Sequence, residues 1–99
     1  MEFKELERLV IDWANDRGIL SNGTTMGQAE KTHEEVLELI SAIDEDDRDE
    51  VIDAIGDITV TLIIQAKMQG LEFEQCLESA YNVITKRKGK MSGGKFIKE

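Results

Sequence analysis

The stretch Asp53-Ala-Ile-Gly-Asp57-Ile-Thr-Val-Thr-Leu-Ile-Ile64 decides the fold of this chain. It opens with two carboxylates four residues apart, and its second half is apolar or weakly polar almost all around a helix. A helix of that kind is buried on more than one side. Because 99 residues hold little material for a second layer, we expect a partner subunit to supply it. The carboxylates would then line a cleft at the edge of the helix layer.

Helical periodicity extends outward from this stretch and predicts an all-α chain. Proline is absent, and Leu, Ile, Glu, Lys and Ala fill long segments, which favours helices. We expect one domain over residues 1–99, a four-helix bundle completed by oligomerisation. The predicted helices span residues 2–17, 25–43, 46–69 and 72–88, and residues 89–99 form a flexible or extended tail.

Local signals predict the ends of these helices. Thr25, with Gln28 three residues later, fits a capping box at the start of the second helix. Asp46 or Asp47 would cap the third helix. The basic residues 86–88 would form the last turn of the fourth helix, where positive charge suits the helix dipole.

Composition excludes several classes of protein. The net charge of −9 and the pI of about 4.6 argue against binding to a nucleic-acid backbone. No apolar run approaches the roughly 20 residues of a membrane span, and no signal peptide is visible. Cys76 has no second cysteine to pair with and is expected to be a buried small hydrophobe. These features predict a cytoplasmic protein without nucleic-acid or membrane partners.

A second acidic cluster, Glu34-Glu35-Val-Leu-Glu38, precedes the first. Carboxylates at this spacing share one side of a helix, and two such helices side by side could hold Mg²⁺ beside substrate phosphates. Periodicity alone favours the opposite interpretation, because both clusters point away from the apolar stripes of their helices, as solvated faces do. A cation would relieve the repulsion among these carboxylates, so we expect Mg²⁺ or Mn²⁺ to stabilise the protein.

The order of these motifs resembles the MazG-like nucleotide pyrophosphohydrolases of the all-α NTP pyrophosphatase superfamily. The pattern Lys31-x-x-Glu34-Glu35-x-x-Glu38 is followed by Asp53-x-x-Gly56-Asp57, and the likeness extends to Trp13 and to residues 81–90. The resemblance implies Mg²⁺-dependent hydrolysis of an NTP or dNTP to the nucleoside monophosphate and pyrophosphate. It also implies a MazG-like bundle that forms a homodimer or homotetramer.

The resemblance further assigns roles to individual residues. The chain departs from the family motif at Ala54, where the family usually has a glutamate. Asp53 is the nearest substitute, and Glu50 is the next. The implied metal ligands are Glu35, Glu38, Asp53 and Asp57. The implied water-orienting residues are Glu34 and Glu38. The implied substrate contacts are Trp13, Lys31, Asn82, Lys86 and Arg87.

Other interpretations of these residues remain open. Trp13 lies on an apolar helix face and could be a core residue, and Asn82 could be an ordinary exposed residue. Glu30-x-x-His33 is one half of a di-iron signature that only a symmetric dimer could complete, but His33 lies on the apolar side of its helix and is expected to be packed. The alternative function is a non-enzymatic acidic helical module that acts as an interaction or regulatory dimer.

Overall fold

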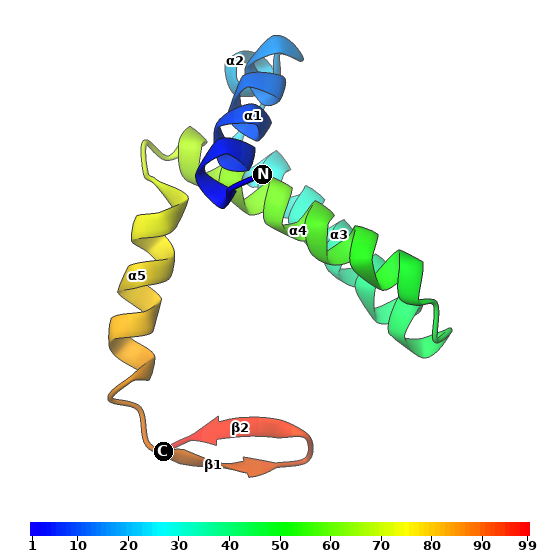
Figure 1. Ribbon diagram of the computed structural model, residues 1–99, viewed down its shortest axis with the longest axis vertical. Helices are drawn as coiled ribbons and strands as arrows, with labels where there is room; N and C mark the ends of the chain where they lie inside the picture. The colour runs from blue at the N-terminus through cyan, green and yellow to red at the C-terminus, as the bar shows by residue number, and fades with distance from the viewer.

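The computed structural model describes all 99 residues and confirms an all-α fold, with five helices and one small β-hairpin. The elements are α1 (Phe3–Asp16), α2 (Ile19–Asn22), α3 (Thr25–Asp44), α4 (Arg48–Met68), α5 (Phe73–Ile84), β1 (Gly89–Ser92) and β2 (Lys95–Lys98). Figure 1 shows the α3–α4 pair as one arm and α5 with the hairpin as a second arm, joined near α1. No helix combines the length and the apolarity that a membrane crossing requires.

The antiparallel helices α3 and α4 form the centre of the structure. Along each helix, buried or partly buried residues recur at alternating intervals of three and four, the spacing of a coiled-coil seam. The Thr32 hydroxyl donates to the Thr61 hydroxyl at 2.8 Å across this seam, and the Gln65 amide donates to the Thr25 carbonyl oxygen at 2.9 Å. The buried or partly buried residues at this spacing, which we name the seam, are Gln28, Thr32, Glu35, Leu39 and Ala42 on α3, and Val51, Ala54, Ile58, Thr61, Gln65 and Met68 on α4.

The ends of these helices lie at or within one residue of the positions that the capping residues predict. Asp47 caps α4, as predicted, by accepting a hydrogen bond from the Glu50 N–H. The cap of α3 is Thr24, which accepts from the Gly27 N–H at 2.9 Å, so the prediction of Thr25 was wrong by one residue. The one-turn helix α2 lies between the first two predicted helices, where no helix was predicted.

The C-terminal quarter differs more from the expectation. Helix α5 ends at Ile84 rather than near residue 88, so the basic residues 86–88 follow the helix and do not form its last turn. Residues 89–98 form an antiparallel hairpin. Cys76 is exposed on α5, and His33 is exposed on α3, so the predictions that Cys76 is buried and His33 is packed were wrong.

The hydrophobic core of one chain is small. Only eight residues are buried, and none of the large side chains is fully buried. The apolar stripe of α3 faces outward, with Leu37, Ile40 and Ile43 more than half exposed, while Glu35 is buried against α4. The interpretation of all these carboxylates as a solvated face was therefore wrong for Glu35. Its helix packs within the chain through the side that carries the carboxylate.

Candidate active site

Three carboxylates meet across the α3–α4 seam. Glu35 and Glu38 lie three residues apart on α3, and Asp57 comes from the facing turn of α4. One oxygen from each of these side chains lies within 4.8 Å of the others. The structure thus brings together three of the four predicted metal ligands.

Glu35 is the buried member of this cluster. It is 9% exposed, and its Oε2 atom has no hydrogen-bond partner. Its Oε1 atom lies 3.8 Å from the Lys31 ammonium group. A hydrogen bond with Glu38 raises the pKa of Glu35 above its ordinary value, and burial and the charges of Glu38 and Asp57 raise it further. Lys31 opposes this shift without cancelling it.

These properties fit a hard divalent cation. A buried carboxylate oxygen without a partner is rare in a folded protein, and a metal ion bound there would satisfy it. Mg²⁺ and Mn²⁺ prefer oxygen ligands. Glu38 and Asp57 are both exposed, so a cation held here would keep positions open for water and phosphate.

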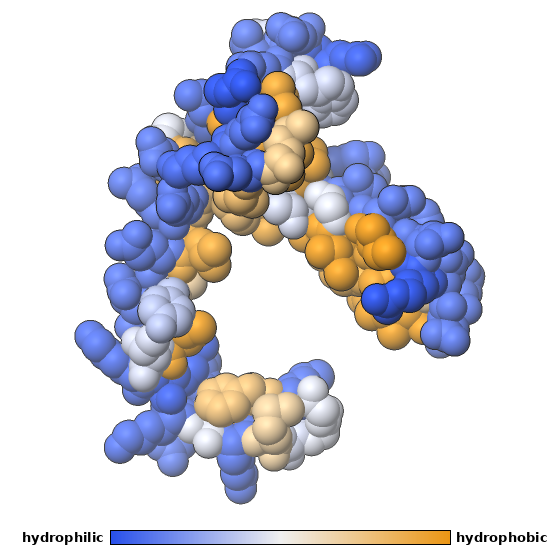
Figure 2. Space-filling view, in the orientation of Figure 1, coloured by the Kyte–Doolittle hydropathy of each residue, from blue (hydrophilic) through white to orange (hydrophobic).

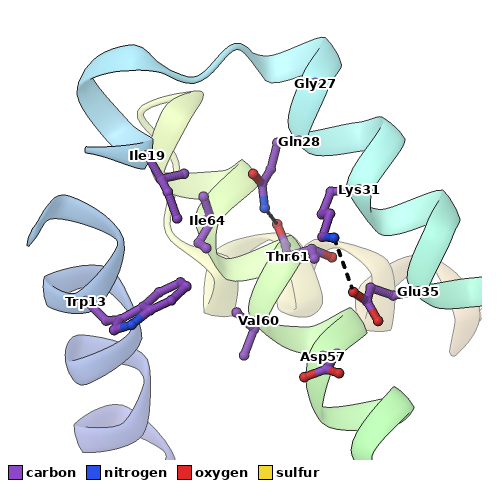
Figure 3. Close-up of a pocket in the computed structure, with 10 residues that line it drawn as sticks. All are labelled: Trp13, Ile19, Gly27, Gln28, Lys31, Glu35, Asp57, Val60, Thr61 and Ile64. Carbon is purple, nitrogen blue, oxygen red and sulfur yellow. Dashed lines mark hydrogen bonds and ion pairs between the residues drawn. The ribbon is translucent and has the colours of Figure 1, made fainter. Parts of the chain in front are cut away.

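A pocket of about 440 Å³ adjoins the carboxylates, between α1–α2 and the α3–α4 pair. Figure 3 shows the Trp13 indole on one side of it and Glu35 and Asp57 at its opposite edge. The pocket is of the size that binds small ligands. Its wall is apolar toward α1 and α2 and polar toward α3. The lining residues are Trp13, Ile19, Gly27, Gln28, Lys31, Glu35, Asp57, Val60, Thr61 and Ile64.

Two of the predicted substrate contacts, Trp13 and Lys31, line this pocket. Trp13 is 46% exposed, and the Arg17 guanidinium lies 5.7 Å from its ring centroid. It is therefore no core residue. Gln28 and Thr61 also line the pocket, and neither was predicted as a site residue. The sequence does contain a signal for Thr61. It lies four residues after Asp57 and therefore shares the side of α4 that carries the carboxylates.

Other predicted residues lie outside the cluster. Glu34 is exposed and pairs with Lys31 at 3.4 Å. Asp53 is exposed and does not join the three carboxylates. Burial and the charges of Asp53 and Asp47 raise the pKa of Glu50, so acidic groups are crowded along this side of α4.

The rival di-iron arrangement and the distal substrate contacts are not assembled in one chain. Glu30 and His33 are exposed and are not part of the carboxylate cluster. The backbone of α5 approaches only α4, and the hairpin approaches no other element. Asn82, Lys86 and Arg87 therefore lie away from the pocket of their own chain (Figure 1).

The fold and the site together define an all-helical protein with a candidate divalent-metal centre beside a ligand-sized pocket. Residues 3–82 match the phosphoribosyl-ATP pyrophosphohydrolase family, and the chain belongs to this family, a member of the MazG-like all-α NTP pyrophosphatase superfamily. The expected resemblance is thereby confirmed.

One relative comes from Haemophilus phage HP1, where it is described as an uncharacterized 18.2 kDa protein in the rep-hol intergenic region. It is 31% identical over 71 residues, which are 72% of this chain and 44% of the relative. The chain therefore matches less than half the length of this relative. No solved structure gives a significant match.

Proposed function

We propose that this chain hydrolyses nucleoside triphosphates, NTP or dNTP, to the nucleoside monophosphate and pyrophosphate with Mg²⁺ or Mn²⁺ as cofactor. Membership of a pyrophosphohydrolase family supports the reaction class. The observation that carries the proposal is the cluster of Glu35, Glu38 and Asp57 at the edge of the Trp13 pocket.

In this proposal the three clustered carboxylates hold the cation. The bound ion supplies positive charge that offsets the triphosphate and polarises its phosphorus–oxygen bonds. Asp53 lies one turn before Asp57 and adds negative charge beside the set. Lys31, at 3.4–3.8 Å from two carboxylates, occupies the border between the cluster and the pocket and neutralises a phosphate oxygen there.

The attacking water is oriented by a carboxylate of this chain. Glu38 is the stronger candidate, because it belongs to the cluster and is exposed, so its second oxygen is free to accept a proton. Glu34 is the other candidate, but its carboxylate pairs with Lys31. The base of the nucleotide stacks on the Trp13 indole against the apolar wall of Ile19, Val60 and Ile64.

The direct test is a product analysis. The protein is incubated with Mg²⁺ or Mn²⁺ and a panel of NTPs, dNTPs and phosphoribosyl-ATP, and the phosphate products are identified by ³¹P NMR. We expect monophosphate and pyrophosphate. Glu38→Gln and Asp57→Asn should each reduce kcat by at least about 100-fold, while the matched control Glu30→Gln, an exposed carboxylate of α3 outside the cluster, retains activity.

Two results would contradict the proposal. Release of the nucleoside diphosphate and inorganic phosphate, in place of the monophosphate and pyrophosphate, would show that the chain catalyses a different reaction. Absence of turnover, with no shift of Tm on addition of Mg²⁺ or Mn²⁺, would favour the non-enzymatic interaction or regulatory dimer.

A further inference from the structure

The pocket beside the carboxylates has two ends of different character. Lys31, Glu35 and Asp57 lie at the charged end, where the proposed function places the triphosphate. The other end is apolar, and Figure 2 shows apolar surface where α1 meets α4. The apolar lining residues are Trp13, Ile19, Val60 and Ile64.

Gln28 brings a polar group with a fixed orientation into this apolar end. Its partly buried side-chain amide donates from Nε2 to the Thr61 carbonyl oxygen at 3.4 Å. Because a carbonyl oxygen only accepts hydrogen bonds, the amino end of the amide must face Thr61. The Oε1 atom therefore points the other way, and Figure 3 shows it on the side of Ile19 and Ile64. No group of the chain donates a hydrogen bond to this oxygen.

The other polar groups at this end of the pocket are engaged or are not acceptors. The Thr61 hydroxyl is 5% exposed and donates to the Ile58 carbonyl oxygen at 2.7 Å. The Gly27 N–H donates to the hydroxyl of the residue that caps α3. The Trp13 indole offers a donor N–H and no acceptor. The pocket therefore presents Oε1 of Gln28 as its free acceptor to a group that lies on Trp13.

We infer that Gln28 determines base specificity, because its Oε1 atom accepts a hydrogen bond from the exocyclic amino group of a nucleobase stacked on Trp13. This inference rests on the proposed function, which brings a nucleotide to the pocket. Adenine and cytosine carry such an amino group, whereas their deaminated counterparts, hypoxanthine and uracil, carry a carbonyl oxygen at the same position. Two acceptors would then face each other, and the apolar wall offers neither of them another donor. The chain therefore favours the amino member of each pair.

The fluorescence of Trp13 measures this preference without metal or turnover. Trp13 is the single tryptophan of the chain and lines the pocket, so its emission reports on a base bound there. Dissociation constants are measured by titration with CMP and UMP, and with AMP and IMP. Each pair differs in the amino or carbonyl group of the base and shares its sugar and phosphate. Within a pair that binds, we expect the amino member to bind about tenfold more tightly.

Substituting Gln28 identifies the group that makes the distinction. Gln28→Met keeps an unbranched side chain of similar length and removes the acceptor, so the ratio of the two dissociation constants should fall to about one. Gln65→Met is the matched control. Gln65 is also a partly buried glutamine, donates to the Thr25 carbonyl oxygen at 2.9 Å, and does not line the pocket. This control loses a comparable hydrogen bond between α3 and α4 and should keep the native ratio. The Tm of each variant shows that it is folded.

Three results would overturn the inference. They are equal affinities within both pairs for the native chain, a native ratio retained in Gln28→Met, and tighter binding of UMP or IMP, which would identify the ring N–H of a keto base as the donor. Absence of quenching by all four nucleotides would overturn it as well.

The same measurements separate this inference from the proposed hydrolysis. A chain that prefers CMP or AMP through Gln28 but releases no pyrophosphate would refute the proposed function and leave the role of Gln28 in place. A chain that hydrolyses both members of each pair with the same kcat/KM would confirm the reaction and refute the role of Gln28.

Discussion

The hydroxyl groups of Thr32 and Thr61 meet at 2.8 Å across the α3–α4 seam and bond the two helices directly to each other. Thr61 is 5% exposed and also donates to the Ile58 carbonyl oxygen at 2.7 Å. Glu35 follows Thr32 by three residues, and Asp57 precedes Thr61 by four. In antiparallel helices this placement brings the two carboxylates opposite each other, at the candidate metal centre.

Substituting these threonines with valine should reveal their coupling. Thr32→Val or Thr61→Val removes the contact between the two hydroxyls, together with the bond of the substituted hydroxyl to the Gln28 or Ile58 carbonyl oxygen. Each variant should lower the free energy of unfolding by about 1–2 kcal/mol. The double variant should cost less than the sum of the two, because each single variant already loses the one contact that the two hydroxyls share. Urea denaturation of all four proteins measures this difference. Strictly additive costs would show that the contact does not couple the helices.

The raised pKa of Glu35 predicts how pH affects the metal-free protein. Because the native pKa lies above the unfolded value, near 4.5, the stability contributed by this carboxyl is fully present below that value. It is lost as the pH rises through the native pKa. The metal-free chain should therefore lose part of its free energy of unfolding between these two pKa values as pH increases. Urea denaturation across this range measures the slope, and Glu35→Gln should remove this component.

Divalent cations should reverse this pH dependence of the stability. Mg²⁺ binds the deprotonated carboxylates and competes with protons for them. The increase in Tm caused by saturating Mg²⁺ should therefore grow as the pH rises through the native pKa of Glu35. An increase that does not change with pH, or that persists in Glu35→Gln, would place the bound cation elsewhere.

The sequence predicted the long helices well because their signals are local. Caps, glycine stops and apolar periodicity lie within a few residues of the features that they predict. The apolar second half of α4 also predicted correctly that this helix is buried on several sides, since Thr61, Ile63, Ile64 and Ala66 are buried by α3 and by the elements packed on α4.

The orientation of α3 could not be predicted in the same way. Periodicity finds the apolar face of a helix, but it does not identify the surface that this face covers. Leu37 and Ile40 are exposed in the single chain, while the polar residues Thr32 and Glu35 face α4.

The C-terminal end of α5 was predicted four residues too late, at residue 88 instead of Ile84, for a related reason. Lys86 and Arg87 are good helix formers, but the chain leaves the helix at Thr85 to enter the hairpin.

Trp13 provides a test of nucleotide binding that is separate from metal binding. Its indole forms one side of the pocket and is 46% exposed, so its removal should change the stability of the fold little. Stacking of a base on an aromatic ring contributes about 1–3 kcal/mol. Trp13→Ala should therefore raise KM about tenfold or more and change kcat less, and Trp13→Phe should recover part of the loss. An unchanged KM in Trp13→Ala would exclude base stacking at this position.

Ala54 provides a test of how many cations the site holds. It is 4% exposed on the seam, three residues before Asp57, at the position where the resemblance to MazG-like enzymes leads us to expect a glutamate. Ala54→Glu adds a fourth carboxylate and a larger side chain to a closely packed position. Without metal we expect it to lower the free energy of unfolding by about 1–3 kcal/mol. With Mn²⁺ it should bind one ion more than the native chain, as counted by electron paramagnetic resonance.

Ala54→Gln is the matched control, because it has nearly the same volume as the glutamate variant but no charge. It should lose a similar amount of stability and gain no ion, so the difference between the two variants isolates the carboxylate. Equal Mn²⁺ counts in both variants would show that the seam at this position does not face the cluster. A higher count in Ala54→Glu alone would mean that the native alanine limits the site to the cations held by Glu35, Glu38 and Asp57.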